Sequence, residues 1–426
     1  MRGIDQLRVA SRLVAAMRSQ WWSAARIRQY QQSALLRVMR HAATHVPFYQ
    51  RLKLPAEALS SAADLERFPV IDKQQLQQDP QAFIAAGFDP AKLYASRTSG
   101  SSGQPTTTYF DRDAWLLAKY VLKMRRIAAT IGMPMLRRVM IISEQPPERL
   151  DSLAEAAPSG LGIFFQQRHL SIHTPIEQHL GALQRYRPHV IYAFPSYLLD
   201  LIATAARCAT PLPKIATLFT SSEVLSAEAR ARIESAFSGR LYDVYGSTEF
   251  KEVAWQCEQG RYHLNFESVY IDAPEQGTCA PVVLSTVCNF AMPLLRFDIG
   301  DRAVFGSNEC RCGRASSHMM QFIGREGDMI TLPSGRRLSP YLLTTAIEAE
   351  GSILQYRIVQ TQVDAMRIDV IVRSPGQSAP WRQRVCAELG RIVEEPVRFE
   401  VREVNALQRD RSGKRSVFVR LPAGGS

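Results

Sequence analysis

The sequence predicts an α/β fold, with a large N-terminal domain of mixed or parallel sheets covered by helices and a small C-terminal α+β domain. Between residues 114 and about 240, short apolar runs such as RVMIIS, HVIYAF and IATLFTS alternate with helical stretches such as 222–237. Such runs are typical of buried parallel strands. The chain turns strand-rich after 241, and from 326 it reads strand–turn–helix–strand. We therefore expect domains at residues 1–324 and 325–426.

The composition excludes several classes of protein. Of the 426 residues, 46% are hydrophobic and 22% are charged, which excludes a disordered, collagen-like or small disulfide-rich chain. No apolar run approaches the roughly 18 residues that span a bilayer, and the first residues lack the apolar core of a secretory signal. The seven cysteines lie at irregular positions, unlike a disulfide framework. We expect a cytoplasmic protein without a transmembrane segment.

The first 60 residues have helical spacing, which breaks at Pro47. Their first 40 positions hold eight arginines and one acid, Asp5, in a chain of net charge +12. Such a segment can contact nucleic acid, an acidic membrane surface or an acidic protein, although a solvated amphipathic helix is the plainer interpretation. No nucleic-acid-binding motif accompanies the charge, so we do not predict nucleic-acid binding.

Hydroxyls and glycines replace any periodicity between residues 96 and 108, so this segment is expected to be a loop. Glycines let the backbone approach a ligand closely, and N–H groups and hydroxyls suit phosphate oxygens, although a flexible turn has the same composition. The loop is not a P-loop, because no Gly-Lys-Ser/Thr ends it. It therefore needs positive charge from elsewhere. The candidate phosphate-binding residues are Thr98, Ser99, Gly100, Ser101, Ser102, Gly103 and Thr106.

Four more motifs follow in order: Tyr245-Gly246-Ser247-Thr248-Glu249, RFDIGD at 296–301, GREGD at 324–328 and RSGK at 411–414. With the hydroxyl loop, they resemble the adenylate-forming (acyl- and aryl-CoA ligase) superfamily. The opening LLRVMRHAATHVPFYQRL and the run AMPLLRFDIGD are most similar to its phenylacetate–CoA ligase branch. The resemblance covers residues 35 to 420. It implies ATP-dependent activation of a carboxylic acid to an acyl-adenylate with release of pyrophosphate, then acyl transfer to coenzyme A.

The resemblance also implies a nucleotide site. The hydroxyl loop would surround the ATP phosphates, and Glu249 would hold Mg²⁺, a cation that favours carboxylate and phosphate oxygens. Tyr245, within the segment that includes Gly246, Ser247 and Thr248, would lie against the adenine. Ser222 and Glu223 would lie near the adenine edge, and Asp301 would accept hydrogen bonds from both ribose hydroxyls.

A second implied group belongs to the C-terminal domain. Arg325 would contact the nucleotide beside the interdomain hinge, and Lys414 would neutralise charge as the substrate carboxylate attacks the α-phosphorus. If this domain is mobile, its movement removes Lys414 and admits the second acceptor. Gly327 stands where the family usually has an acidic hinge residue, and glycine tolerates the φ/ψ changes of a rotation.

The acid pocket is expected to include Phe194, Ser196, Ser221, Tyr245 and Gly246. Aromatic walls with few charges favour an aromatic or other apolar acid. Phe194 is equally compatible with ordinary core packing. No residue in these stretches fixes the length of the acid.

Cys257, His263, Cys310 and Cys312 would give the Cys₃His set of a closed structural zinc site. The Cys-x-Cys spacing is less common than Cys-x-x-Cys, but the same pattern occurs in relatives on this branch. The alternative is three reduced thiols near a solvated histidine.

Three alternatives remain at this stage. The acyl group can pass to an amine or to the thiol of a carrier protein, for which the basic N-terminal segment offers complementary charge. A chain with this fold can also be a non-catalytic binding protein. The sequence does not determine the oligomeric state, for which a homodimer is one expectation.

Overall fold

The computed structural model describes residues 3–97, 106–132, 137–143, 165–272, 277–306, 310–316, 318–325, 329–373, 380–407 and 416–421. These residues fall into two compact units. The first holds the described residues between 3 and 132 and between 242 and 322, and the second holds those between 137 and 241 and between 323 and 421. The predicted boundary beside Arg325 stays a prediction. Within the described ranges, no helix is long and apolar enough to cross a membrane.

The first unit begins with helices α1 (Gly3–Ser19) and α2 (Ala24–His45). Ser23 caps α2, because its side chain accepts a hydrogen bond from the backbone N–H of Arg26, and Pro47 follows the end of the helix. The apolar side chains of α2 pack into the same core as the strands of this unit. The shorter elements that follow are α3 (Pro47–Gln50), η1 (Ala56–Ala58), η2 (Ala62–Arg67), α4 (Lys73–Gln78), η3 (Pro80–Phe83) and η4 (Pro90–Lys92).

Helix α1 is held by contacts with residues far along the chain. Arg12 donates to the backbone carbonyl of Asp113 over 2.9 Å, and the Ser19 hydroxyl donates to Glu267 over 2.6 Å. Just beyond the helix, the Gln20 side chain accepts from the Arg314 guanidinium over 3.2 Å. The basic N-terminal segment is therefore a docked helix rather than a free tail.

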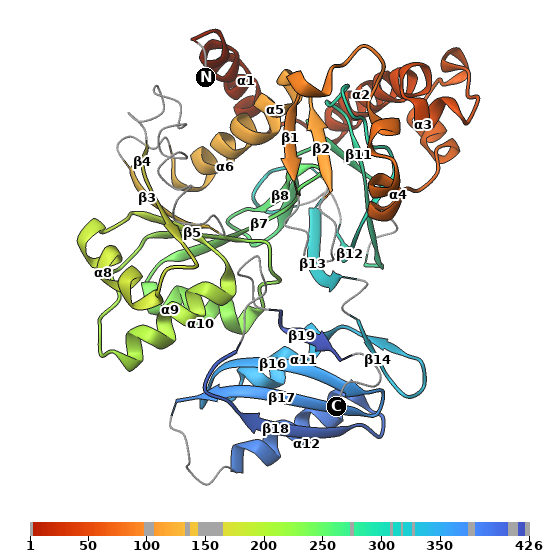
Figure 1. Ribbon diagram of the computed structural model, residues 1–426. Coiled ribbons are helices and arrows are strands. Elements are labelled where there is room, and N and C mark those ends of the chain that lie inside the picture. The colour runs from red at the N-terminus through yellow and green to blue at the C-terminus, as the bar shows by residue number, and fades with distance from the viewer. Residues whose placement is uncertain are drawn as a thin grey trace. The chain divides into compact units, whose positions relative to one another are not determined.

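The strands of the first unit form two sheets (Figure 1). Strands β1 (Tyr94–Arg97) and β2 (Thr107–Phe110) are an antiparallel pair. They are followed by α5 (Arg112–Leu116), the π-helical turn η5 (Leu117–Val121) and α6 (Leu122–Ile131). The larger sheet has the order β10, β11, β12, β13, β9, β8, β7. Its strands are β7 (Arg240–Ser247), β8 (Lys251–Gln256), β9 (Tyr262–Leu264), β10 (Val269–Ile271), β11 (Cys279–Thr286), β12 (Phe297–Phe305) and β13 (His318–Arg325).

The second unit contains the predicted parallel strands, β3 (Arg137–Ser143), β4 (Phe165–Ser171), β5 (Val190–Ala193) and β6 (Thr217–Ser221). They lie in the order β6, β5, β3, β4 and all run parallel. Helices α8 (Ile176–Tyr186), α9 (Pro195–Arg207) and α10 (Ala227–Phe237) lie beside them (Figure 1). The helix expected at 222–237 begins later, because Ser222 is left-handed at φ 72° and Ser226 caps the helix.

The C-terminal part of this unit has the predicted α+β character. Helix α11 (Pro340–Glu348) follows the small pair β14 (Ile330–Thr331) and β15 (Arg337–Leu338). A four-stranded sheet has the order β18, β17, β16, β19, with one helix, α12, between β17 and β18. Its elements are β16 (Ile353–Gln362), β17 (Ala365–Val372), α12 (Pro380–Val393), β18 (Arg398–Glu403) and β19 (Phe418–Arg420). These elements share one apolar core. The α/β fold class is confirmed.

A buried histidine in α8 makes the stability of the second unit depend on pH. His179 is 2% exposed and its Nδ1 is hydrogen-bonded to the Tyr197 hydroxyl of α9. Burial lowers the pKa of His179 to about 4. In the unfolded chain His179 is protonated below about pH 6.5, whereas in the folded chain it stays neutral down to about pH 4. The folded state therefore loses stability as the pH falls through this window. Across this pKa difference, the free energy of unfolding falls by roughly 3 kcal/mol.

We expect His179→Gln, which keeps a polar partner for Tyr197, to flatten the fall in unfolding free energy between pH 7 and pH 5. The measurement is chemical denaturation at a series of pH values. The exposed His173 supplies a matched control, since His173→Gln is expected to leave the slope unchanged. An unaltered slope in the His179 variant would show that its protonation does not control stability.

Candidate active site

The YGSTE motif includes the last three residues of β7 and the first two of the turn that leads to β8. Ser247 pairs with Lys251 across the hairpin, and the Ser247 hydroxyl accepts a hydrogen bond from the Phe250 backbone N–H over 3.2 Å. A Cβ atom on Gly246 would lie 2.3 Å from the Lys251 carbonyl oxygen, so only glycine fits this close approach. Glu249 lies in the turn and is 8% exposed. The tight turn places this carboxylate at one end of the sheet.

Tyr245 and Asp301, predicted to bind adenosine, lie together. The Tyr245 hydroxyl donates to the Asp301 carboxylate over 2.8 Å, although the two residues are 56 positions apart. The Tyr245 ring packs against Phe322, with centroids 3.9 Å apart. Gly300 takes φ 78° and its N–H donates to the Asp298 carboxylate over 2.8 Å, which shapes the backbone just before Asp301. The tyrosine therefore orients an acid that can accept further hydrogen bonds.

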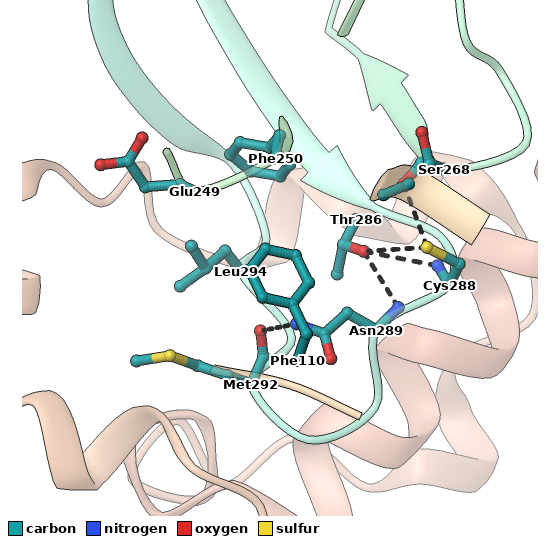
Figure 2. A pocket seen from close by; sticks show the side chains of 10 residues that line it. Phe110, Glu249, Phe250, Ser268, Thr286, Cys288, Asn289, Met292 and Leu294 are labelled. Atoms are coloured by element: carbon teal, nitrogen blue, oxygen red, sulfur yellow. Dashed lines mark hydrogen bonds between the residues drawn. The ribbon is translucent and has the colours of Figure 1, made fainter. Parts of the chain in front are cut away.

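The Glu249 side chain is available to a cation. It makes no hydrogen bond or ion pair with the residues that the structure describes. A small cavity of about 10 Å³, the space of one water molecule, lies under the turn. Figure 2 shows the Glu249 carboxylate pointing away from this cavity, whose polar groups Thr286, Cys288 and Asn289 bond to one another. The cavity is a packing void and is too small for an organic acid.

Five predicted residues gather in the second unit, at the carboxyl ends of β5 and β6. Both Glu223 oxygens bind Ser196, one accepting from its backbone N–H over 2.9 Å and the other from its hydroxyl over 2.8 Å. Because Phe194 caps α9 without a side-chain hydrogen bond, Glu223 stabilises that helix start instead. The Tyr192 hydroxyl donates to Ser221 over 2.7 Å. Ligands of parallel sheets bind at this end of the strands.

Several predicted residues lie elsewhere. Thr106 is buried, at 2% exposed, immediately before β2, and Arg325 is exposed at the end of β13. The hydroxyl-rich segment 98–105, the hinge residue Gly327 and Lys414 fall outside the described residues.

The four predicted zinc ligands meet in one cluster. Cys257, His263, Cys310 and Cys312 place their ligand atoms within 4.8 Å of one another. The Cys312 sulfur lies 3.2 Å from His263 Nε2, and His263 Nδ1 is 3.2 Å from the Ser316 hydroxyl. Burial alone would raise the pKa of Cys312, but hydrogen bonds, above all with His263, lower it to about 6. A thiolate facing an oriented imidazole is the donor chemistry that zinc prefers.

Two polar residues near these sites were not predicted. Arg314 lies between the rings of Trp21 and Trp255 and links the cysteine cluster to Gln20. Lys251 is partly buried near Glu249, and burial lowers its pKa to about 8, with Lys119 acting in the same direction and the Glu249 carboxylate in the opposite one. The absence of a lysine from the hydroxyl loop was the signal that could have directed attention to Lys251.

Comparison with known proteins finds two similar coenzyme A ligases. The chain is 25% identical over 381 residues to a phenylacetate-coenzyme A ligase of Thermus thermophilus, and the match covers 82% of each chain. It is 24% identical over 331 residues to the phenylacetate-coenzyme A ligase of Aromatoleum evansii, with 69% of each covered. Over most of its length the chain is therefore similar to phenylacetate–CoA ligases.

Solved structures of coenzyme A ligases share the fold of this chain. The crystal structure of 2-hydroxyisobutyryl-CoA ligase in its postadenylation state matches with a TM-score of 0.79 and 20% identity, covering 95% of this chain and 91% of that one. An anthranilate CoA ligase bound to anthranoyl-AMP matches with a TM-score of 0.55 and 15% identity, covering 78% and 67%. No family model matches the chain.

Proposed function

We propose that the ligase joins a carboxylic acid, aromatic or otherwise apolar, to coenzyme A in two steps driven by ATP. In the first, a carboxylate oxygen attacks the α-phosphorus, and the bond to the bridging oxygen breaks so that pyrophosphate leaves with the electron pair. In the second, the thiol of coenzyme A, which loses its proton, attacks the acyl carbon and AMP leaves. We place this activity in the cytoplasm.

One observation carries this proposal most directly. Tyr245 and Asp301 come from separate motifs and are joined by a hydrogen bond of 2.8 Å, on the same sheet as the Glu249 turn. An aromatic face, an acid that accepts from hydroxyls and a second acid for a cation are the groups that an Mg·ATP site needs. The family relationship supports the same assignment.

Glu249 is the residue that we assign to Mg²⁺. Its carboxylate makes no competing hydrogen bond within the described residues, so an oxygen-preferring cation fits it. When bound, Mg²⁺ would offset the repulsion between the attacking carboxylate and the polyphosphate. Asp301 would hold the ribose, and Tyr245 keeps that acid in position through its hydroxyl.

The acid is assigned to the region near Phe194, Ser196 and Ser221. The charged residue of this region is Glu223, and both of its carboxylate oxygens are bonded to Ser196. The walls of the proposed pocket therefore offer mainly aromatic and hydroxyl groups. Such walls favour an acid whose only charge is its carboxylate. Arg325, Gly327 and Lys414 are proposed for the mobile C-terminal domain, with its boundary at Arg325.

The decisive experiment is acid-dependent release of pyrophosphate across a panel of aromatic and aliphatic carboxylates, with and without coenzyme A. Turnover that rises strongly with coenzyme A supports the proposal and identifies the class of acid. Release that is indifferent to coenzyme A would move the acceptor to an amine or a carrier protein. No release with any acid, from protein that binds ATP, would contradict the proposed activity.

We also propose a structural zinc ion at Cys257, His263, Cys310 and Cys312. Protein purified without chelators is expected to contain about one zinc per chain by elemental analysis, and Cys312→Ser is expected to lose zinc and thermal stability. Cys208 is exposed and lies outside the cluster, so Cys208→Ser should keep both. Zinc-free protein of normal stability would exclude the site.

A further inference from the structure

Lys251 directs its amine inward, beside the proposed cation ligand. Its Nζ contacts the Ser96 hydroxyl of β1 and lies 5.0 Å from the centroid of the Trp115 ring and 5.3 Å from that of Phe110. The Glu249 carboxylate attracts the amine, but among the described residues no carboxylate comes within ion-pair distance of it. A partly buried ammonium without a bonded acid is costly unless an anion joins it.

The left-handed backbone conformation of Lys251 indicates that a lysine side chain is needed at this position. The residue takes φ 64°, a left-handed conformation that favours glycine and costs other residues roughly 1–2 kcal/mol. The hairpin itself would be easier to form with glycine at this position. A lysine here therefore contributes something that the turn does not need.

Lys119 adds a second positive charge close to Lys251. Lys119 Nζ lies 4.4 Å from the Trp115 ring centroid, so two ammonium groups face the same indole. Lys119 is carried by η5, a π-helical turn of the kind that often occurs at functional sites. Two like charges repel each other, and an anion near both would relieve that repulsion.

The sequence supplies the reason for an anion here. Ser96 lies two positions before Thr98, where the hydroxyl-rich run proposed for the ATP phosphates begins, and residues 98–105 contain no lysine or arginine. Glu249, two positions before Lys251 along the chain, is the proposed magnesium ligand. Among the described residues, the amine therefore contacts Ser96, just before the hydroxyl-rich run in the sequence, and lies near the proposed magnesium ligand.

We propose that Lys251 binds the β- and γ-phosphoryl oxygens of ATP and the pyrophosphate that leaves. This inference rests on the proposed adenylation reaction and adds a phosphate-binding residue to it. As the bond between the α-phosphorus and the bridging oxygen breaks, the Lys251 ammonium donates a hydrogen bond to the phosphoryl oxygens that gain charge. It gives up no proton in this step.

The test uses Lys251→Met, which keeps the apolar stem and removes the charge, together with Lys251→Gly. Binding of ATP, inorganic pyrophosphate and AMP is measured by calorimetry. We expect both variants to bind ATP and pyrophosphate about 10- to 100-fold more weakly, the range expected for a lost charge-assisted hydrogen bond. AMP lacks the β- and γ-phosphates, so its affinity should stay within about twofold of wild type.

Lys53 gives a matched control, because it is also a left-handed lysine, at φ 53°, and is exposed. Lys53→Gly should leave all three affinities unchanged. Because Lys251→Gly removes backbone strain, it should fold and melt no lower than Lys251→Met, so a loss of binding is not a loss of fold. Lys251→Arg should recover part of the pyrophosphate affinity.

Pyrophosphate binding by Lys251→Met within about twofold of wild type would overturn the inference, since the side chain would then only fill space between the rings. An equal loss of AMP affinity would overturn it too, by showing a general distortion of the site. Wild-type protein that binds neither AMP nor ATP would instead refute the proposed function, and this inference with it.

Discussion

Replacing Glu249 by glutamine is expected to slow acid-dependent pyrophosphate release by about 100-fold or more, the usual cost of removing a well-placed electrostatic group. The substitution keeps the size of the side chain and removes the charge that would hold Mg²⁺. Since the carboxylate makes no hydrogen bond or ion pair with the described residues, thermal stability should change little. The measurement is a magnesium titration of the initial rate, in which the variant should need a much higher concentration of the cation.

Glu400, exposed on β18, supplies the control for this experiment. Glu400→Gln should retain the wild-type rate and magnesium dependence. A Glu249→Gln enzyme with a normal rate at low magnesium would show that another group binds the cation.

Replacing Lys414 by alanine is expected to lower the rate of adenylation by two to three orders of magnitude, because a charge well placed for the transition state has an effect of that size. The expectation comes from the RSGK motif, since Lys414 lies outside the described residues. The two half-reactions should separate. Formation of thioester from acyl-adenylate supplied ready-made should stay close to wild type, because that step no longer involves attack on phosphorus.

The exposed Lys214 provides a comparison, as Lys214→Ala should leave both half-reactions intact. Near-normal adenylation by Lys414→Ala would mean that another cation offsets the charge of the transition state. Equal loss of both half-reactions would point to damage of the C-terminal domain as a whole.

The sequence was most informative about the parallel strands of the second unit. Strands buried on both faces need continuous apolar runs, and RVMIIS, HVIYAF and IATLFTS became β3, β5 and β6. Helix starts were less certain. Ser226 carries an N-cap signal that marks the start of α10, but the left-handed Ser222 that delays the helix has no such signal.

Individual hydrogen bonds between residues on different strands could not be predicted. Glu223 is expected near the adenine edge, which stays a prediction; the bonds of its carboxylate to Ser196 depend on the side-by-side pairing of β5 and β6 and could not be predicted. The bond between Tyr245 and Asp301 depends in the same way on how their strands lie in one sheet. Hydrophobic periodicity in the sequence indicates which side of a helix or strand is buried. It does not indicate which residue of another helix or strand packs against that side.

The anchoring of helix α1 has a consequence for synthesis of the chain. Arg12, Ser19 and Gln20 find partners that are 101, 248 and 294 positions later. At usual translation speeds, the chain needs roughly 15 to 60 s to extend as far as Arg314. Within that time the helix finds its first partners, Asp113 and the side chains of Leu116 and Val121, but it lacks its bonds to Glu267 and Arg314 until late. Nascent chains that end before Glu267 should therefore hold α1 less firmly, and expose it more to proteases or chaperones, than full-length chains do.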